Sequence, residues 1–144
     1  MTKSSAMPEQ HEINLHPLGV IHTPYRQKFA IPRQPNLVDA ALGEIVFDKE
    51  FSDPNMLRGI EQFSHLWLLF QFHKTVEQGW SPMVRPPRLG GNKKQGVLAT
   101  RSTFRPNGIG MSVVKYDSIQ HKNGRLSLLV KGVDLLDGTP IIDI

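Results

Sequence analysis

The stretch SHLWLLFQFH, residues 64–73, is the most apolar segment of the chain and decides which fold we expect. Successive side chains of a β-strand point to opposite faces. If the stretch is a strand, one face carries Leu66, Leu68, Phe70 and Phe72. The opposite face carries His65, Trp67, Leu69, Gln71 and His73. A strand that is apolar on nearly both faces lies in the centre of a sheet or barrel, so this segment predicts a β-rich core.

Shorter strand-like segments surround this central one. Lys122-Asn123-Gly124 predicts a hairpin turn, because Asn-Gly favours the tight turns that join two antiparallel strands. Asp53 and Pro54 predict the start of a short helix that runs to about Phe63. The predicted strands are residues 13–23, 43–47, 96–100, 111–116, 125–130, 133–136 and 140–144. Many short strands with one or two short helices predict an all-β protein, either a barrel or a sandwich.

Length and composition indicate one globular domain. The chain has 144 residues, of which 39% are hydrophobic and 21% are charged. We expect this domain to span residues 13–144, behind a disordered polar tail of residues 1–12. The sequence stops inside an apolar, strand-like run, which is typical of a chain truncated at its C-terminus.

The absence of cysteine excludes disulfides, thiolate metal sites and cysteine nucleophiles, and it fits a reducing cytoplasm. No apolar run approaches the length of a membrane span, and residues 1–12 lack the apolar core of a signal peptide. We therefore expect a cytoplasmic protein with no membrane partner.

The positive charge of the chain is concentrated in residues 84–111. This stretch has no acidic residue, and the chain carries a formal net charge of +4, so everything outside its six basic residues sums to −2. Prolines and glycines flank the charges and predict rigid loops that hold them in place. The six basic residues are Arg85, Arg88, Lys93, Lys94, Arg101 and Arg105. A local basic surface favours an anionic partner such as nucleic acid, and ordinary solvated loops are the alternative.

Common catalytic signatures are missing. His65 and His73 share a strand face but would lie roughly 26 Å apart, so they do not share a metal ion. The sequence contains no Gly-x-Ser-x-Gly elbow, no P-loop and no Rossmann glycine spacing. The sequence therefore predicts no metal site, no covalent nucleophile and no doubly wound nucleotide site.

Three residues, His73, Asp134 and Phe104, are candidates for ligand contact. His73 is either a surface residue that ends the apolar strand or a ligand contact at the mouth of a barrel. Asp134 is a candidate acceptor for ligand hydroxyls, whereas Asp137, before Gly138, reads as part of a turn. Phe104, beside Arg105, is either a core residue or a stacking platform for a base.

Several long motifs then occur in order along the chain. They are PRQP at 32–35, ExFSHLW at 61–67, FH at 72–73, RPPRLGGN at 85–92, ATRSxFRPN at 99–107 and DLLDGTP at 134–140. With these motifs the chain, from about Leu15 to Ile144, resembles the TsaA-like (YaeB/TrmO) family of tRNA methyltransferases.

The resemblance implies a β-barrel enzyme that uses S-adenosylmethionine. Its substrate would be the threonylcarbamoylated adenosine next to the anticodon, methylated on N6, and the active form would be a homodimer with the cofactor near the subunit interface. Carried over by motif, the cofactor site comprises Gln34, Pro35, Asn36, His73, Lys74, Arg101, Met111, Lys131, Gly132, Val133 and Asp134. Arg101 suits the cofactor carboxylate, because a guanidinium forms a bidentate pair with it. No general base is identified, and water or the carboxylate of the modified base remain open.

The anticodon arm of tRNA would lie on the basic stretch, with phosphate contacts from Arg85, Arg88, Lys93, Lys94 and Arg105. Two alternatives stay open at this point. One is a non-catalytic RNA- or ligand-binding module that uses the same basic face without a cofactor. The other is an interaction protein whose apolar strands serve mainly to form a dimer.

Overall fold

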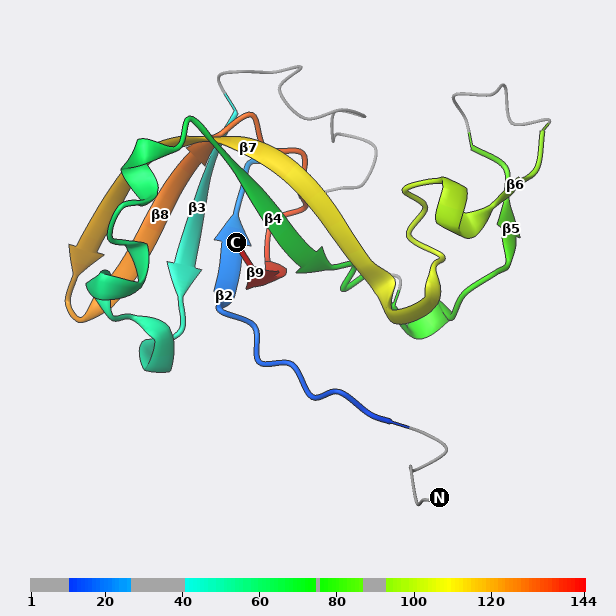
Figure 1. Ribbon diagram of the computed structural model, residues 1–144, viewed down its shortest axis with the longest axis horizontal. Helices are drawn as coiled ribbons and strands as arrows, with labels where there is room; N and C mark the ends of the chain where they lie inside the picture. Colours follow the sequence, from blue (N-terminus) through cyan, green and yellow to red (C-terminus); the bar gives the residue numbers. More distant parts are fainter. Residues whose placement is uncertain (1–10, 27–40, 75, 87–92) are drawn as a thin grey trace, which may run out of the picture.

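The computed structural model of the chain describes residues 11–26, 41–74, 76–86 and 93–144. Its centre is a closed antiparallel barrel with the strand order β2-β3-β8-β7-β4-β9. The strands are β2 (Gly19–His22), β3 (Leu42–Phe47), β4 (His65–Gln71), β7 (Ile109–Lys122), β8 (Arg125–Lys131) and β9 (Thr139–Asp143). Figure 1 shows β9 closing the barrel between β2 and β4. The predicted all-β barrel is confirmed.

Strand β7 is the long element that joins the two sides of the barrel. Its first half pairs with β4, from Gln71 opposite Ile109 to His65 opposite Lys115. Its second half pairs with β8, and the register shifts between Tyr116 and Ser118, a β-bulge that bends the strand. The curvature is visible in Figure 1, where β7 arches over the barrel.

The predicted turn between β7 and β8 is confirmed. Lys122 pairs with Arg125, so Asn123 and Gly124 form a two-residue loop. Both have positive φ angles, 53° and 74°, as a type I′ turn requires.

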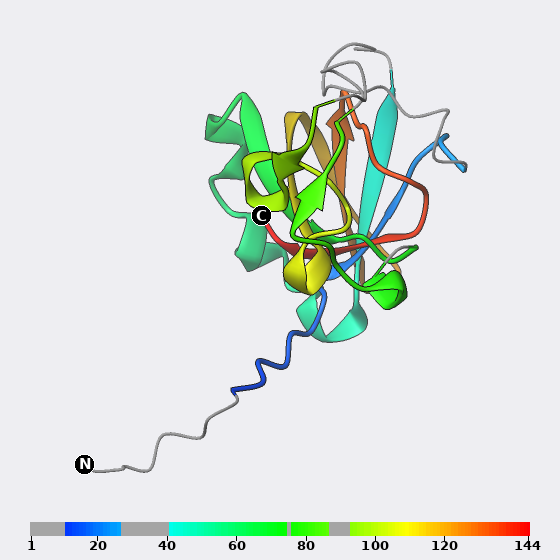
Figure 2. The same ribbon diagram turned by 90° about the vertical axis from the view of Figure 1, so that its right-hand side faces the viewer.

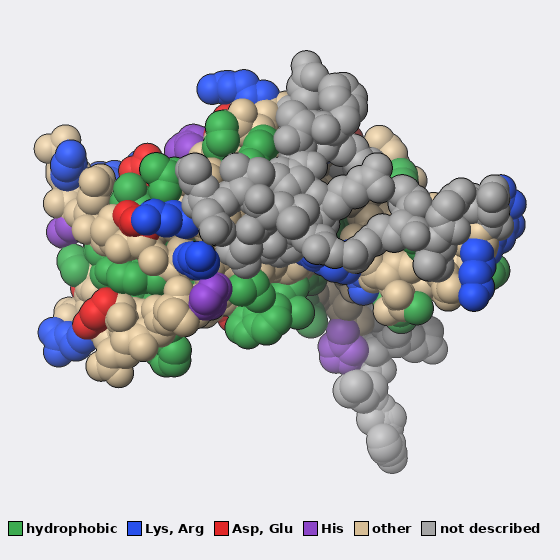
Figure 3. Space-filling model, turned by 90° about the horizontal axis from the view of Figure 1, so that it is seen from above, with side chains coloured by type: hydrophobic (Ala, Val, Ile, Leu, Met, Phe, Trp, Pro, Cys, Tyr) green, Lys and Arg blue, Asp and Glu red, His purple; other side chains and the backbone are tan. Residues whose placement is uncertain are grey.

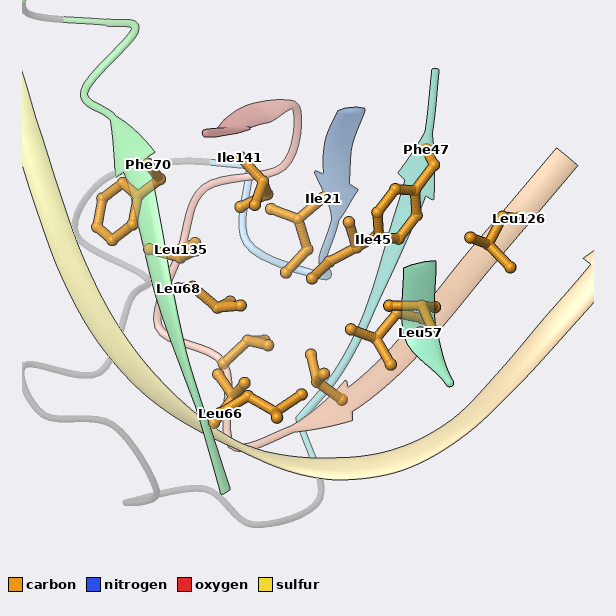
Figure 4. Packing of buried hydrophobic residues seen from close by; sticks show 14 of the residues in the cluster. Ile21, Ile45, Phe47, Leu57, Leu66, Leu68, Phe70, Leu126, Leu135 and Ile141 are labelled. Carbon is orange, nitrogen blue, oxygen red and sulfur yellow. The ribbon is translucent and has the colours of Figure 1, made fainter. Parts of the chain in front are cut away.

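The interior of the barrel follows the alternation predicted for residues 64–73. Leu66, Leu68 and Phe70 are buried, whereas Trp67 on the outer face is 60% exposed. Figure 4 shows these side chains inside the barrel, in one cluster with Ile21, Ile45, Phe47, Leu126 and Ile141 from the other strands. Burial of apolar area at about 25 cal/mol per Å² is the main term that stabilises this core.

Three local predictions were wrong. The helix expected from Asp53 is broken into two 3₁₀ turns, Pro54–Leu57 and Ile60–Gln62, because Arg58 is extended and Gly59 is left-handed with φ = 89°. Asp53 does cap the first turn, since it accepts a hydrogen bond from the Asn55 amide at 2.9 Å. The strand expected at 96–100 is a 3₁₀ turn, Val97–Ala99, and residues 133–136 form a loop with no strand pairing.

The segment between β4 and β7 leaves the barrel as a separate lobe, which we call the arm (residues 72–108). Its described parts, 72–74, 76–86 and 93–108, contain the short hairpin β5 (Met83–Val84) with β6 (Gln95–Gly96), and three 3₁₀ turns, Val76–Gln78, Val97–Ala99 and Pro106–Gly108. Figure 1 shows the arm beside the barrel, and Figure 2 shows it from the front.

Another 3₁₀ turn, Lys49–Phe51, follows β3. Residues 1–10 of the predicted tail lie outside the described residues, and residues 11 and 12 are exposed. Across the described ranges, no helix is long and apolar enough to cross a membrane.

Candidate functional site

A pocket of about 240 Å³ lies where the end of β4 and the start of β7 meet the arm. Its wall is apolar apart from two arginines and a threonine. The lining residues are Leu69, Phe72, Thr100, Arg101, Arg105, Ile109, Gly110 and Met111. Two of these, Arg101 and Met111, are among the residues assigned to the cofactor from sequence.

Gly110 allows the pocket wall to close around two aromatic rings. A Cβ atom at this position would lie 2.6 Å from ring atoms of both Phe70 and Phe72. The two rings pack edge to face, with centroids 5.2 Å apart and an interplanar angle of 85°. A glycine is therefore needed here for space and not for backbone conformation.

Arg101 is the basic group with the most extensive set of contacts at this pocket. Its Nη2 atom donates a hydrogen bond to the carbonyl oxygen of Met111 at 2.7 Å, and lies 3.8 Å from Oδ2 of Asp134. The Arg101 side chain is 58% exposed, whereas that of Asp134 is 6% exposed. A half-exposed guanidinium is thus backed by a buried carboxylate.

Asp134 is held by a second contact. The Ser112 hydroxyl donates a hydrogen bond to its Oδ1 atom at 2.5 Å. Burial raises the pKa of the Asp134 carboxyl, while the Ser112 hydrogen bond and the Arg101 charge act in the opposite direction.

The loop between β8 and β9 sets the direction of Asp134. Val133 and Leu135 are buried in the barrel core, so the side chain between them points the other way, toward β7. The loop is anchored by Gly132, whose amide donates to the Ala41 carbonyl at 2.8 Å, and by Thr23, whose hydroxyl donates to the Leu135 carbonyl at 2.7 Å.

Asp137 belongs to the turn that the sequence predicted, followed by Gly138 with φ = 85°. It accepts a hydrogen bond from the Thr23 amide at 3.0 Å, and lies 3.3 Å from His22 Nδ1 and 3.8 Å from Arg26 Nη1. The Thr23 amide is the main cause that lowers the pKa of the Asp137 carboxyl. This carboxylate ties β2 to the loop before β9.

Among the described residues, the others assigned to the cofactor are not part of the pocket lining. His73 is half-buried, and burial, followed by the charge of Lys74, lowers the pKa of its imidazole. Lys131 pairs with Asp117 at 3.2 Å, at the β7 bulge. Gly132 and Val133 are buried in the loop that carries Asp134. Gln34, Pro35 and Asn36 lie outside the described residues.

The basic residues of the arm divide into two groups. Arg85, Lys93 and Lys94 are exposed, and Figure 3 shows Lys and Arg side chains at the end of the arm. Arg105 is half-buried, and its Nη1 atom donates to the Thr100 carbonyl at 2.8 Å, so it is part of the pocket wall. Arg88 lies outside the described residues. Trp80, also on the arm, is 61% exposed.

Sequence reasoning missed Ser112 and Gly110. Ser112 follows Gly110 at the strand spacing of two, so it was predictable as an inward residue of β7. Its polar partner was not predictable, because Asp134 lies 22 residues further along the chain.

Taken together, the fold and site define a small antiparallel β-barrel with an arginine-bearing pocket beside a basic arm. Comparison with known proteins then identifies the family. The model for the "tRNA-methyltransferase O N-terminal domain" matches residues 20–144, and the chain belongs to this family. The family resemblance drawn from the sequence motifs is confirmed.

The relatives that match this chain are longer proteins. This chain is 54% identical over 127 residues to the tRNA (adenine(37)-N6)-methyltransferase of Escherichia coli (strain K12). The aligned region covers 88% of this chain and 54% of that protein. A crystal structure of TrmO from Pseudomonas aeruginosa matches with a TM-score of 0.73 and 41% identity, over 92% of this chain and 54% of that one. Two relatives, from Pseudomonas aeruginosa (50% identical, 91% of this chain and 53% of the relative) and Pyrococcus abyssi (38%, 89% and 64%), carry S-adenosylmethionine in their names. The chain spans about half the length of the first of these curated relatives.

Proposed function

We propose that this chain carries the cofactor-binding barrel of a tRNA (adenine-N6)-methyltransferase. The substrate would be the threonylcarbamoylated adenosine next to the anticodon, and the methyl donor S-adenosylmethionine. The proposal rests on family membership together with one observation, a half-exposed Arg101 guanidinium fixed at the edge of an apolar pocket.

The pocket fits a ligand with an apolar body and an anionic end. Leu69, Phe72 and Met111 provide apolar surface, and Arg101 provides a cation suited to a carboxylate. S-adenosylmethionine supplies an already activated methyl group, so the protein needs mainly to align the accepting nitrogen with it. His73, Lys74, Lys131 to Asp134 and residues 34–36 would complete the site, as the sequence motifs imply.

We further propose that the active form is a homodimer. A volume of about 240 Å³ is below the roughly 300–1,000 Å³ of typical small-molecule pockets, which fits a pocket that further residues enlarge. Beside the pocket, the outer faces of β4 and β7 carry adjacent exposed apolar side chains: Trp67 at 60%, Met111 at 49% and Ile109 at 37%. A second copy seated there would bury this surface and supply further pocket residues.

The RNA would lie on the arm, where Arg85, Lys93 and Lys94 project and Trp80 offers a ring for stacking. A protein that acts on tRNA would work in the cytoplasm, which completes this proposal.

The deciding experiment is a methyl-transfer assay. The protein is incubated with tRNA that carries threonylcarbamoyladenosine and with isotopically labelled S-adenosylmethionine, and the digested nucleosides are analysed by mass spectrometry. We expect label on N6 of the modified adenosine. Binding of tRNA without binding of S-adenosylmethionine would instead favour a non-catalytic RNA-binding module. A monomer in sedimentation at micromolar concentration that still binds the cofactor fully would refute the shared pocket.

A further inference from the structure

The Arg101 guanidinium needs contacts other than packing to fix its orientation. Its side chain is 58% exposed, so packing does not confine it. A free arginine side chain loses rotamer entropy when a ligand fixes it. A device that orients the guanidinium in advance therefore raises affinity without touching the ligand.

Two contacts provide such a device. Arg101 Nη2 donates to the Met111 carbonyl at 2.7 Å, which ties it to β7. The same atom lies 3.8 Å from Asp134 Oδ2. The carbonyl fixes the position of the group, and the carboxylate supplies the opposite charge behind it.

Both carboxylate oxygens of Asp134 already have partners within the protein. Its two carboxylate oxygens face Ser112 and Arg101, and its side chain is 6% exposed. A ligand hydroxyl has little access to such a group. The geometry therefore favours an action on Arg101 over the direct hydroxyl contact that the sequence suggested.

Ser112 is the buried end of the arrangement. It is 2% exposed and lies on the inner face of β7, where the next inward residue is Val114. A hydroxyl among apolar side chains is costly unless it is hydrogen-bonded. Its partner is Asp134, at 2.5 Å, so the serine orients the carboxylate.

We infer that Ser112 and Asp134 are positioning residues that hold the Arg101 guanidinium ready for the carboxylate of the ligand. Ser112 fixes Asp134, and Asp134 fixes Arg101. This inference rests on the proposed function, in which Arg101 pairs with the carboxylate of S-adenosylmethionine.

The test compares two ligands by calorimetry. S-adenosylmethionine has the carboxylate, and 5′-methylthioadenosine lacks the amino-acid end that carries it. The variants are Arg101→Ala, Asp134→Asn and Ser112→Ala. The control is Ser127→Ala, which truncates another buried serine of the barrel, 8% exposed on β8.

Arg101→Ala is expected to weaken S-adenosylmethionine binding by tenfold or more, in line with removal of a charged hydrogen bond of about 1.5–3 kcal/mol. Ser112→Ala and Asp134→Asn are expected to weaken it by about threefold to tenfold. None of the three should change the affinity for 5′-methylthioadenosine, and Ser127→Ala should change neither affinity.

The opposite outcomes are distinct. If Ser112→Ala and Asp134→Asn lower the affinity for both ligands equally, the role of these two residues is structural and the inference is wrong. If Arg101→Ala alone reduces affinity, the inference is wrong but the proposed function stands. If the wild-type protein binds no S-adenosylmethionine, both are wrong. Should Ser112→Ala fail to fold, Asp134→Asn decides by the same comparison.

Discussion

Asp134 and Asp137 lie three residues apart in one loop, yet the structure shifts the pKa values of their carboxyls in opposite directions. Burial raises the pKa of Asp134, although Ser112 and Arg101 oppose this. The Thr23 amide lowers the pKa of Asp137, whose side chain is 24% exposed. The two aspartates therefore differ in role because their surroundings differ. Asp134 lies behind Arg101 of the pocket, and Asp137 links β2 to the loop before β9.

Asp137→Asn tests the structural role of that carboxylate. An asparagine oxygen still accepts from the Thr23 amide, but the charge is removed. Because the folded-state pKa of Asp137 lies below 3.8, its stabilisation is present above that pH and disappears as the pH falls through the lowered value. We expect the variant to be about 0.5–1 kcal/mol less stable at pH 7, with a smaller difference near pH 3. Urea unfolding at both pH values measures this, and an equal difference at both would contradict it.

Arg101→Ala tests the pocket at the level of one residue. We expect it to lower S-adenosylmethionine affinity far more than Lys122→Ala, which removes an exposed lysine beside the β7–β8 turn. The reason is that Arg101 lines the pocket, and a charged hydrogen bond contributes about 1.5–3 kcal/mol. Thermal shift with added cofactor provides the measurement. Equal affinities in the two variants would remove Arg101 from the site.

At the scale of elements, two glycines of β7 and its turn have different physical reasons. Gly110 leaves space for Phe70 and Phe72, whereas nothing lies within 4 Å of a Cβ atom built at Gly124. Gly124 is needed for its backbone, with φ = 74°, beside Asn123 with φ = 53°. The type I′ turn they form matches the twist of β7 and β8 and sets the register of the hairpin.

Gly124→Ala isolates that backbone effect. An alanine in the left-handed region costs about 1–2 kcal/mol, so we expect the free energy of unfolding to fall by about 1 kcal/mol. Gly96→Ala is the matched control, because Gly96 is exposed, has φ = −58° and also has nothing within 4 Å of its Cβ position. Chemical denaturation compares the two. A Gly96 variant destabilised as much as the Gly124 variant would show that the turn conformation is not the cause.

For the whole molecule, the arrangement of charge is the main feature. The arm carries Arg85, Lys93 and Lys94 away from the barrel, and Figure 1 shows the β7–β8 turn on the opposite side. The pocket lies between these two parts, at the root of the arm. An RNA held by the arm would therefore present its base close to the pocket.

The salt dependence of tRNA binding tests this arrangement. Removing one lysine or arginine that binds a phosphate should reduce the slope of log affinity against log salt by about 0.7–0.9. We expect that reduction for Arg85→Ala, Lys93→Ala and Lys94→Ala, and no change for Lys122→Ala at the far turn. Arg105→Ala should instead reduce cofactor affinity, because its guanidinium is bonded to the Thr100 carbonyl at the pocket. An unchanged slope for all three arm variants would place the RNA elsewhere.

Local patterns in the sequence were enough to locate the strands of the barrel, though not every predicted strand formed, and to identify the family. The alternation in residues 64–73 predicted which side chains of β4 are buried, and Asn123-Gly124 predicted the hairpin turn. These features depend on neighbours along the chain, through the two-residue period of a strand and the φ angles open to glycine. The helix predicted from Asp53 did not form as one element. Asp53 caps its first turn, but the left-handed Gly59 interrupts the backbone six residues later.

The site itself was decided by tertiary structure. Motifs pointed to Arg101 and Asp134, but nothing in the sequence indicated that Ser112 would join them or that Arg105 would turn inward to Thr100. Barrel closure sets the register of β7 against β4. Val133 and Leu135 are buried in the core of the closed barrel, so the Asp134 side chain between them faces β7. Such long-range pairing depends on the packing of all six strands at once, which no local pattern encodes.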